Sequence, residues 1–525
     1  MAFSLVQAGT NLYSLNTDGA LSAALTLPTG VTLSSTRIPR FARFKNYVIL
    51  VNTPTRPLSI STEGVVRVLT PSPPGSALTL TNANGGALSG TYTAKHTFII
   101  LDAAGNLIAE SDYSAVSNSV AITTDYLRAT NINISADTIT ARRLYRTVTL
   151  GTAYFKWIDV DGNVAVAVQD DLTDAGLGLV EAGTLGTAPD LVLIAEWIGR
   201  LWGVGRSAGD DLRYTQAGQM YAWSALNTLP IPHVGDDRYG ITALVPRRDV
   251  LGVGRRNRIV QVAGNQTSNI RPIGVIESCG ILSQESVIVY RDIVFFLWLD
   301  GVYRWDSNGV TCVSDDVGVR SWFTSNDYFN RGMFSQAFAS FDPVNTAYRL
   351  FLCSPGQTTT DRWVEYSLRT GKFYGPHLTS AFTPSCAVTI RGTNDQPYPC
   401  VGSREGFLSQ DVDTKSDWGI TPIAMRVETR GHDNGSPDRE KYFGELSIHT
   451  QKESAGTLTI TTSVGEEDDP FVNEPVAHDL TLSRERLDRI GTGKNASIVF
   501  ENNEINQDVT IYGYEIDPVH ETGKR

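Results

Sequence analysis

Short stretches in which apolar and polar residues alternate cover most of the chain, and turn-forming residues separate them. Alternation with a period of two is typical of β-strands that bury one face. Helical spacing is scarce. The best helix candidate is the segment 483–490, in which Ser483 would cap a short amphipathic turn, and a second candidate covers 319–329. We therefore predict an all-β protein with at most two short helices.

One pattern recurs along the chain: a short apolar strand, a tight polar turn and a second apolar strand. Its copies lie at 44–49, 197–202, 245–251, 289–294, 341–351 and 388–398. The last four turns are spaced by about 44 to 51 residues, which is the length of one four-stranded propeller blade. The repeat therefore predicts a β-propeller.

The first interval between these turns is about 110 residues too long for one blade. The segment 71–75 (PSPPG) marks a boundary by its proline density. Strands are predicted beyond it at 90–102, 107–114, 119–123, 129–135, 138–148 and 153–160. This number of short strands is typical of a fibronectin-like or immunoglobulin-like sandwich. We expect an inserted sandwich that projects from the propeller, and we expect the propeller to fold without it.

The charge of the chain becomes strongly acidic after residue 420. Residues 421–525 contain 11 Lys/Arg and 20 Asp/Glu, which is a net charge of −9 out of −12 for the whole chain. Strands are predicted there at 456–463 and 509–516. The predicted domains are a first part of the propeller (1–70), the inserted fibronectin-like sandwich (71–187), the remaining blades (188–420) and an acidic C-terminal β domain (421–525).

Composition and charge narrow the functional classes. An acidic chain is a poor candidate for tight nucleic-acid binding, which depends on neutralising phosphates. The negative charge is compatible with a surface past which DNA slides without binding. It is equally compatible with an acidic domain that only keeps the protein soluble. The longest apolar run, 293–299, is far shorter than the roughly 20 residues of a membrane helix. The N-terminus has no basic residue before its apolar stretch, so we expect no signal peptide and synthesis in a cytoplasm.

No catalytic or metal-binding constellation is visible in the sequence. The segment 205–209 (GRSAG) matches the nucleophile elbow G-x-S-x-G, but a strand rather than a helix is predicted after it. The segments 159–163 and 411–413 resemble calcium loops without the closing bidentate Glu. We interpret 466–469 as an exposed acidic loop. The five cysteines show no C-x-x-C spacing and the seven histidines no i, i+4 pair. We predict no enzyme activity, no cofactor and no metal.

Arginine is dense in one stretch of the chain. One interpretation is that blade turns are simply polar. The other is an inter-subunit or DNA-facing surface, because guanidinium groups pair well with carboxylates and phosphates. The acidic balance elsewhere favours subunit contact over DNA contact. The candidate interface or channel residues are Arg238, Arg247, Arg248, Arg255, Arg256 and Arg258.

The order of these segments resembles the tail nozzle proteins of short-tailed bacteriophages. They are also called tail tubular protein B-like, or packaged-DNA-stabilising, head-to-tail joining proteins. The similarity rests on this layout, on the insert strand 141–147 (ARRLYRT) followed by 151–155, and on the blade stretches 239–262 and 280–305. The resemblance implies a structural virion protein, made in the host cytoplasm and without catalytic activity. It also implies a homo-oligomeric ring, usually a hexamer, around the DNA channel. Its partners would be the adaptor or portal-proximal protein, tail fibre or needle proteins and, transiently, duplex DNA.

Two other functions stay open. The first is a receptor-binding tail protein, in which the insert or the propeller face grips a host glycan. The second is a propeller carbohydrate-active enzyme, which should carry paired carboxylates at blade loops; the nearest approach to a glycosidase S-x-D-x-G-x-x-W box, 305–311, does not match it. For a ring of such acidic subunits we expect a neutral to acidic lumen.

Overall fold

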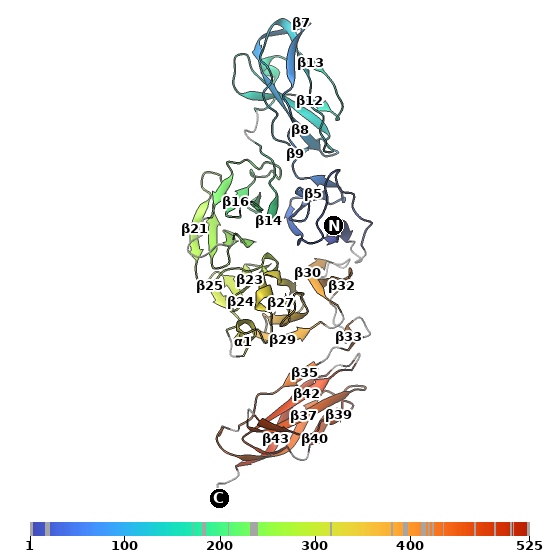
Figure 1. Cartoon of the computed structure of the whole chain (residues 1–525), viewed down its shortest axis with the longest axis vertical. Coiled ribbons are helices and arrows are strands. Elements are labelled where there is room, and N and C mark those ends of the chain that lie inside the picture. Colours follow the sequence, from blue (N-terminus) through green and yellow to red (C-terminus); the bar gives the residue numbers. More distant parts are fainter. Residues whose placement is uncertain are drawn as a thin grey trace. The chain divides into compact units, whose positions relative to one another are not determined.

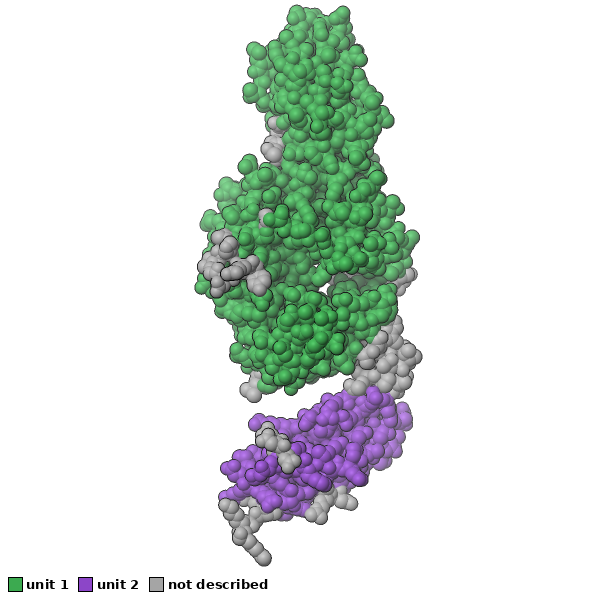
Figure 2. Space-filling view, in the orientation of Figure 1, with its two compact units in different colours: residues 1–410 green, residues 411–525 purple. Residues whose placement is uncertain are grey.

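The computed structural model is an all-β protein with a propeller-like core, an inserted sandwich and a C-terminal β domain (Figure 1). The chain forms two compact units, residues 1–410 and 411–525 (Figure 2). The structure describes residues 4–15, 21–170, 172–180, 185–207, 209–231, 240–315, 318–379, 382–391, 397–410, 416–417, 421–422, 425–433, 435–466, 469–487, 490–504, 507 and 509–521.

The propeller consists, within the described residues, of six antiparallel sheets whose strands pair in chain order. The first is β3 (Arg40–Phe44), β4 (Tyr47–Val51), β5 (Leu58–Ser61) and β6 (Val66–Val68); the second is β14 (Leu191–Trp197), β15 (Arg200–Gly205), β16 (Asp211–Tyr214) and β17 (Thr228–Pro230). The third is β18 (Ala243–Pro246), β19 (Leu251–Gly254), β20 (Ile259–Ala263) and β21 (Arg271–Ile276); the fourth is β22 (Ile288–Tyr290), β23 (Ile293–Trp298), β24 (Gly301–Asp306) and β25 (Gly309–Cys312). The fifth is β26 (Phe338–Asp342), β27 (Ala347–Leu352), β28 (Arg362–Ser367) and β29 (Lys372–Leu378); the sixth is β30 (Pro384–Arg391), β31 (Pro397–Ser403) and β32 (Leu408–Gln410).

The recurring sequence pattern coincides with one structural feature. Each of its six copies contains the turn between the first and second strands of a sheet. In three copies the turn has two residues, which need backbone angles with positive φ, and Lys45, Ile198 and Arg291 adopt φ values of 53°, 49° and 55° there. In these three blades the repeat was visible because the tightest turn has the strictest local requirements.

The sheets follow one another around a ring (Figure 1). First strands of neighbouring sheets lie against each other, as in β3 with β14, β14 with β18, β22 with β26 and β26 with β30. An N-terminal hairpin, β1 (Ser4–Ala8) and β2 (Asn11–Leu15), packs through Leu12 against Leu50, Leu58 and Ile60 of the first sheet. Short helical turns connect the blades at η2 (Gln284–Ser286), α1 (Arg320–Thr324) and η3 (Arg331–Gln336).

The helix predictions had different outcomes. The candidate at 319–329 contains the one-turn helix α1, which buries Phe323. The candidate at 483–490 is wrong, because Arg484–Leu487 form strand β40, which pairs with β36. Four residues fit either period, and pairing to the edge of a sheet decides between them. Residues 488–489 lie outside the described residues.

The insert is a sandwich of two sheets. One contains β7 (Thr79–Tyr92), β10 (Val120–Thr130) and β13 (Val168–Asp170); the other contains β8 (Ala94–Leu101), β9 (Leu107–Glu110), β11 (Ala141–Thr147) and β12 (Tyr154–Asp161), and η1 (Asp174–Gly176) follows. The predicted strand 90–102 is two strands, because the chain passes from one sheet to the other at Thr93. The predicted strand 119–123 lies in β10, which contains a register shift between Thr123 and Asp125, whereas only residues 129–130 of the predicted strand 129–135 belong to β10 and 131–135 form no strand.

A ladder of serines replaces the second half of the predicted strand 107–114. Each serine donates its backbone N–H to a carbonyl of β8 and accepts, on its hydroxyl, the N–H of the same β8 residue. Side-chain hydroxyls thus complete the hydrogen bonding of the β8 edge where regular pairing has ended. The pairs are Ser111 with Phe98, Ser114 with His96 and Ser117 with Ala94.

The C-terminal unit contains, within the described residues, a two-stranded sheet of β33 (Ser416–Asp417) and β34 (Thr421–Pro422) and two larger sheets around one core. The strands of the larger sheets are β35 (Met425–Glu428), β36 (Lys441–Thr450), β37 (Thr457–Glu466), β38 (Asp469–Val472), β39 (Val476–Asp479), β40, β41 (Gly491–Gly493), β42 (Asn495–Asn502) and β43 (Ile511–Glu521). Phe443, Ile460 and Phe500 lie in the core between the sheets. The alternating pattern of 456–463 and 509–516 therefore marked β37 and part of β43.

Candidate functional site

The arginines singled out in the sequence do not form one surface. Arg247 and Arg248 lie in the turn between β18 and β19, whereas Arg255 and Arg256 lie in the next turn, between β19 and β20. Consecutive turns of an antiparallel sheet lie at opposite ends of its strands. These four residues therefore lie at two ends of the third sheet and not on one face. Arg238 lies outside the described residues.

Several of these arginines are part of the propeller itself. Arg255 is fully buried and donates hydrogen bonds to the carbonyl of Ile231, at 3.0 Å, and to Oδ1 of Asp210, at 2.7 Å. The guanidinium of Arg247 lies 4.5 Å from the centre of the Trp305 ring and so joins the third sheet to the fourth. Arg258 is buried as well, and Arg248 and Arg256 are exposed.

The other motifs of the sequence lie in ordinary structural settings. Ser207 follows β15, and the described residues after it, 209–214, lead into strand β16 rather than into a helix. Asp159 forms ion pairs with Arg143 and Lys156, both at 2.8 Å. Glu466 is paired with Lys494; 411–413 and 467–468 lie outside the described residues. Across the part of the chain that the structure describes, no group of three His, Cys, Asp or Glu side chains could hold a metal ion.

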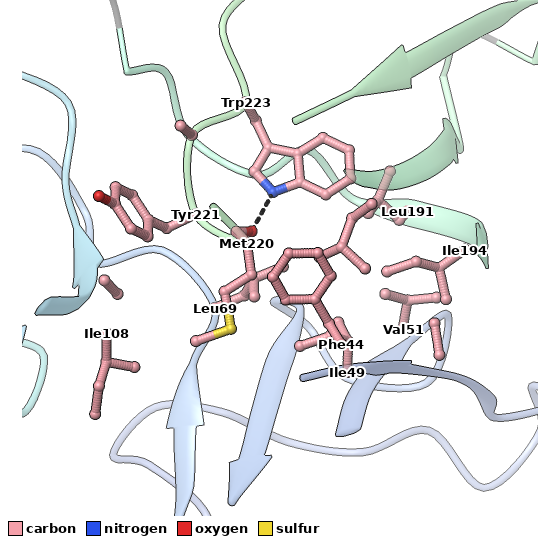
Figure 3. Close-up of a cluster of buried hydrophobic side chains, with 14 of the residues drawn as sticks. Phe44, Ile49, Val51, Leu69, Ile108, Leu191, Ile194, Met220, Tyr221 and Trp223 are labelled. Atoms are coloured by element: carbon pink, nitrogen blue, oxygen red, sulfur yellow. Dashed lines mark hydrogen bonds between the residues drawn. The ribbon is translucent and has the colours of Figure 1, made fainter. Parts of the chain in front are cut away.

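The insert and the propeller share one apolar cluster, which we call the junction cluster (Figure 3). The first sheet contributes Phe44 and Ile49, the insert contributes Ile108, and the loop after β16 contributes Met220 and Trp223. The indole Nε1 of Trp223 donates a hydrogen bond of 3.0 Å to the carbonyl of Met220, which fixes the loop. Because these side chains come from three parts of unit 1, the insert is packed onto the propeller rather than tethered to it.

A cleft of about 500 Å³ opens beside the junction cluster. Four turns and loops line it, and they belong to the first sheet, the insert and the loop after β16. Lys45 crosses one side of it, where Nζ donates a hydrogen bond of 2.7 Å to the carbonyl of Gly218. The lining residues are 44–47, 61–63, 102–104, 107–108 and 218–221.

Two carboxylates face this cleft from different parts of the fold. Hydrogen bonds from the side chains of Ser61 and Thr62 hold the pKa of Glu63 below its usual range. The side-chain amide of Asn106 does the same for the pKa of Asp102. Both groups are therefore ionised at neutral pH, and neither is the protonated carboxyl that a glycosidase uses as its general acid.

A third acid, Glu110 of β9, is buried next to the junction cluster. Its carboxylate accepts hydrogen bonds from the hydroxyls of Thr97, at 2.7 Å, and Tyr145, at 2.6 Å. Burial raises the pKa of Glu110, although these hydrogen bonds and the charge of Arg143 oppose the shift. Burial and the charge of Glu110 also raise the pKa of Tyr221, in the loop after β16, to about 12.

Glu110→Gln should flatten the pH dependence of stability. A carboxyl whose pKa is raised on folding stabilises the protein fully below its ordinary pKa of 4.5, and this contribution is lost as the pH rises through the raised value. Glutamine keeps the acceptor for Thr97 and Tyr145 but does not ionise. Wild type should therefore lose stability relative to this variant as the pH rises above 4.5 in urea unfolding.

Glu63→Gln is the matched control, because the pKa of Glu63 is shifted in the opposite direction. Its carboxylate stabilises the fold above its ordinary pKa, and the contribution is lost as the pH falls through the lowered value. A parallel pH profile for wild type and Glu110→Gln would contradict our account of Glu110.

Sequence reasoning missed the junction cluster. One signal was available: the run 220–223 (MYAW) is an apolar segment in a blade loop, where turns are otherwise polar. A second was Glu110, an acid at the end of the apolar strand 107–110. Neither signal identifies the residues that it packs with, because the cluster brings together residues more than 100 positions apart in the sequence, such as Ile108 and Trp223.

Comparisons with known proteins do not add a functional assignment. No family model and no curated protein matches the chain. Among solved structures, Kluyvelomyces marxianus Hsv2 has a TM-score of 0.26 and 9% identity, covering 69% of this chain and 96% of that chain. An exo-beta-1,3-galactanase from Phanerochaete chrysosporium has a TM-score of 0.20 and 8% identity, covering 81% of this chain and 100% of that chain. Among the described residues, no helix has the length and apolar character needed to cross a membrane.

Proposed function

We propose that this chain is a structural protein of a short-tailed bacteriophage, a tail nozzle that assembles into a ring. The ring would extend the DNA channel below the portal and adaptor, retain the packaged DNA and pass it on at ejection. The observation that supports this proposal is the order of parts in one chain. A propeller is interrupted after its first sheet by a sandwich, and an acidic β unit follows.

The junction cluster adds a mechanical argument. A wall around a DNA channel must keep its shape while DNA passes, so its parts should be packed on one another. The insert meets this need through its apolar contact with the first two sheets. The net charge of −12 per copy is compatible with a bore from which duplex DNA is repelled on every side.

Assembly of the purified chain with its neighbours tests the proposal. Mass photometry and negative-stain imaging would be applied to the full chain alone and after mixing with a portal and adaptor complex. A closed ring of about six copies on that complex supports the nozzle. A chain that stays monomeric and never binds the complex contradicts it.

Arg248→Glu and Arg256→Glu should have unequal effects on ring formation. Both residues are exposed, and they lie at opposite ends of the third sheet. Surface substitutions of this kind change stability by about 0.5 kcal/mol or less, so both variants should fold. If one end of this blade contacts a neighbouring subunit, reversal there lowers the yield of rings in mass photometry and the other variant assembles normally. Normal assembly by both variants would exclude these arginines from the subunit contact.

A second candidate function, recognition of a host glycan by a receptor-binding tail protein, has one observation in its favour. The cleft beside the junction cluster combines the aromatic rings of Tyr47 and Tyr221 with the carboxylates of Glu63 and Asp102. Rings and hydrogen-bonding groups that converge in a cleft are typical of small-molecule sites. Saturable binding to a panel of host surface glycans, without ring formation, would favour this function over the nozzle.

A further inference from the structure

Besides Arg146, whose Nε is unpaired, two buried side chains in the interior of the insert carry nitrogen atoms without a hydrogen-bond partner. They are Arg142 on β11 and His96 on β8, and both are 0% exposed. All three guanidinium nitrogens of Arg142 and Nδ1 of His96 lack a partner. Buried polar groups in native proteins are almost always hydrogen-bonded, so a pair of unpaired ones in one place requires an explanation.

Both side chains lie on the face of the sheet that covers the sandwich core. Leu144 is opposite His96 across β11 and β8, and Arg142 is two residues before Leu144. Leu144 belongs to the apolar core of the insert, and residues two apart on a strand point to the same face. Arg142 and His96 are therefore diagonal neighbours, a spacing that long side chains can bridge.

Every unpaired atom of this pair is a hydrogen-bond donor. Nε2 of His96 accepts a hydrogen bond of 3.3 Å from the backbone N–H of Asn133, so the ring proton is on Nδ1. Burial, and secondly the charge of Arg142, lower the pKa of His96 to about 4, which leaves the ring neutral at neutral pH. A guanidinium stays protonated in proteins. The pair thus presents several N–H groups and one positive charge.

The carboxylates of the insert do not compensate this charge. Arg146, also 0% exposed and on the same face of β11, has its charge compensated, because Nη1 pairs with Asp174 at 2.7 Å, although its Nε lacks a partner. Arg142 has no such partner, and a buried charge without one is strongly unfavourable. Other acidic side chains are engaged elsewhere: Glu110 with Thr97 and Tyr145, Asp137 with Arg56, and Asp159 with Arg143.

We infer that Arg142 and His96 together bind a small monovalent anion, of the size of chloride, inside the insert. The anion accepts hydrogen bonds from the guanidinium and from Nδ1–H, and it neutralises the buried charge. A water molecule could accept hydrogen bonds but would leave the charge uncompensated. Because protein covers all of these nitrogens, the bound species must be small, and its exchange requires local opening of the sandwich.

Hydrogen exchange of the full-length protein tests this inference at the site itself. The wild-type chain would be compared in sodium chloride and in sodium gluconate at equal ionic strength, because gluconate is too large for an enclosed site. We expect the amides of β8 and β11 to exchange about tenfold more slowly in chloride at about ten times its Kd. The amides of β14 and β15 in the propeller should exchange equally in both salts.

Two variants separate the site from general salt effects. Arg142→Met should abolish the difference between chloride and gluconate. Arg146→Met removes the paired arginine from the same face, so it should be destabilised in both salts and keep the chloride effect. Equal exchange of β8 and β11 in both salts for the wild type would overturn the inference, even if Arg142→Met failed to fold. A chloride effect of the same size in Arg142→Met would overturn it as well.

Discussion

Trp223→Ala should lower the free energy of unfolding of the first unit by about 3–5 kcal/mol, the usual cost of removing a buried aromatic side chain. Trp223 is 2% exposed and packs in the junction cluster. Its indole also holds the loop after β16 through the carbonyl of Met220. Urea unfolding followed by circular dichroism measures the loss.

Leu226→Ala is the matched control for this prediction. Leu226 belongs to the same loop and is 85% exposed, so its truncation should change stability by no more than about 0.5 kcal/mol. Protease cleavage at the two connections of the insert, near residues 72 and 187, should also accelerate in Trp223→Ala and not in Leu226→Ala. Equal stability of the two variants would show that the cluster does not anchor the insert.

The junction cluster also changes the expectation that the propeller folds without the insert. Deletion of 71–187 would remove Ile100, Ile108, Ala109 and Leu185 from the cluster. Phe44 and Met220 would then face water at the surface that remains. The sequence indicated a separate sandwich from its strand count alone, and a strand count contains no information on how tightly two domains pack.

The propeller was predictable because its repeats depend on local chemistry. Three blades begin with a hairpin whose two-residue turn needs unusual backbone angles, as at Lys45, Ile198 and Arg291. Such turns leave a similar pattern in the sequence, whatever packs around them. Strand limits inside the insert were less predictable, because tertiary contacts decide them. The ladder that begins at Ser111 ends β9 early by pairing serine hydroxyls with β8.

The arginine-rich stretch shows why nearness in sequence is a poor guide to a site. Two turns only a few residues apart lie at opposite ends of the same sheet, so Arg248 and Arg256 face different sides of the propeller. Arg255 is buried because Asp210, which directly precedes β16, supplies its carboxylate. The sequence alone does not show this contact, so it does not distinguish a buried arginine from an exposed one.

An ion pair between Asp137 and Arg56 also joins the insert to the propeller. Asp137, in the loop before β11, accepts hydrogen bonds from Nη1 and Nη2 of Arg56, at 2.5 and 3.0 Å. It accepts a third from the backbone N–H of Ser72, at 2.8 Å. The aspartate side chain is 4% exposed, whereas that of Arg56 is 31% exposed and keeps part of its hydration.

Asp137→Ala should therefore lower the free energy of unfolding by about 2–3 kcal/mol, less than the roughly 3–5 kcal/mol lost when a fully buried pair is broken. Asp190→Ala is the matched control. Asp190 pairs with Arg206 at 2.7 Å, but their side chains are 48% and 34% exposed, so the loss should be at most about 1 kcal/mol. Similar losses for both variants would contradict the role of burial.

The same aspartate should give the first unit an acid-sensitive step. Burial opposes ionisation, but the hydrogen bonds and charge of Arg56 and the N–H of Ser72 prevail and lower the pKa of Asp137. A carboxyl with a lowered pKa contributes stability above its ordinary value of 3.8, and the contribution is lost as the pH falls through the folded-state value. Asp137→Asn cannot ionise, so the difference in urea midpoint between wild type and this variant should be constant above pH 5 and shrink below about pH 4. A difference that stays constant down to about pH 2 would mean that the charge of Asp137 does not hold the insert in place.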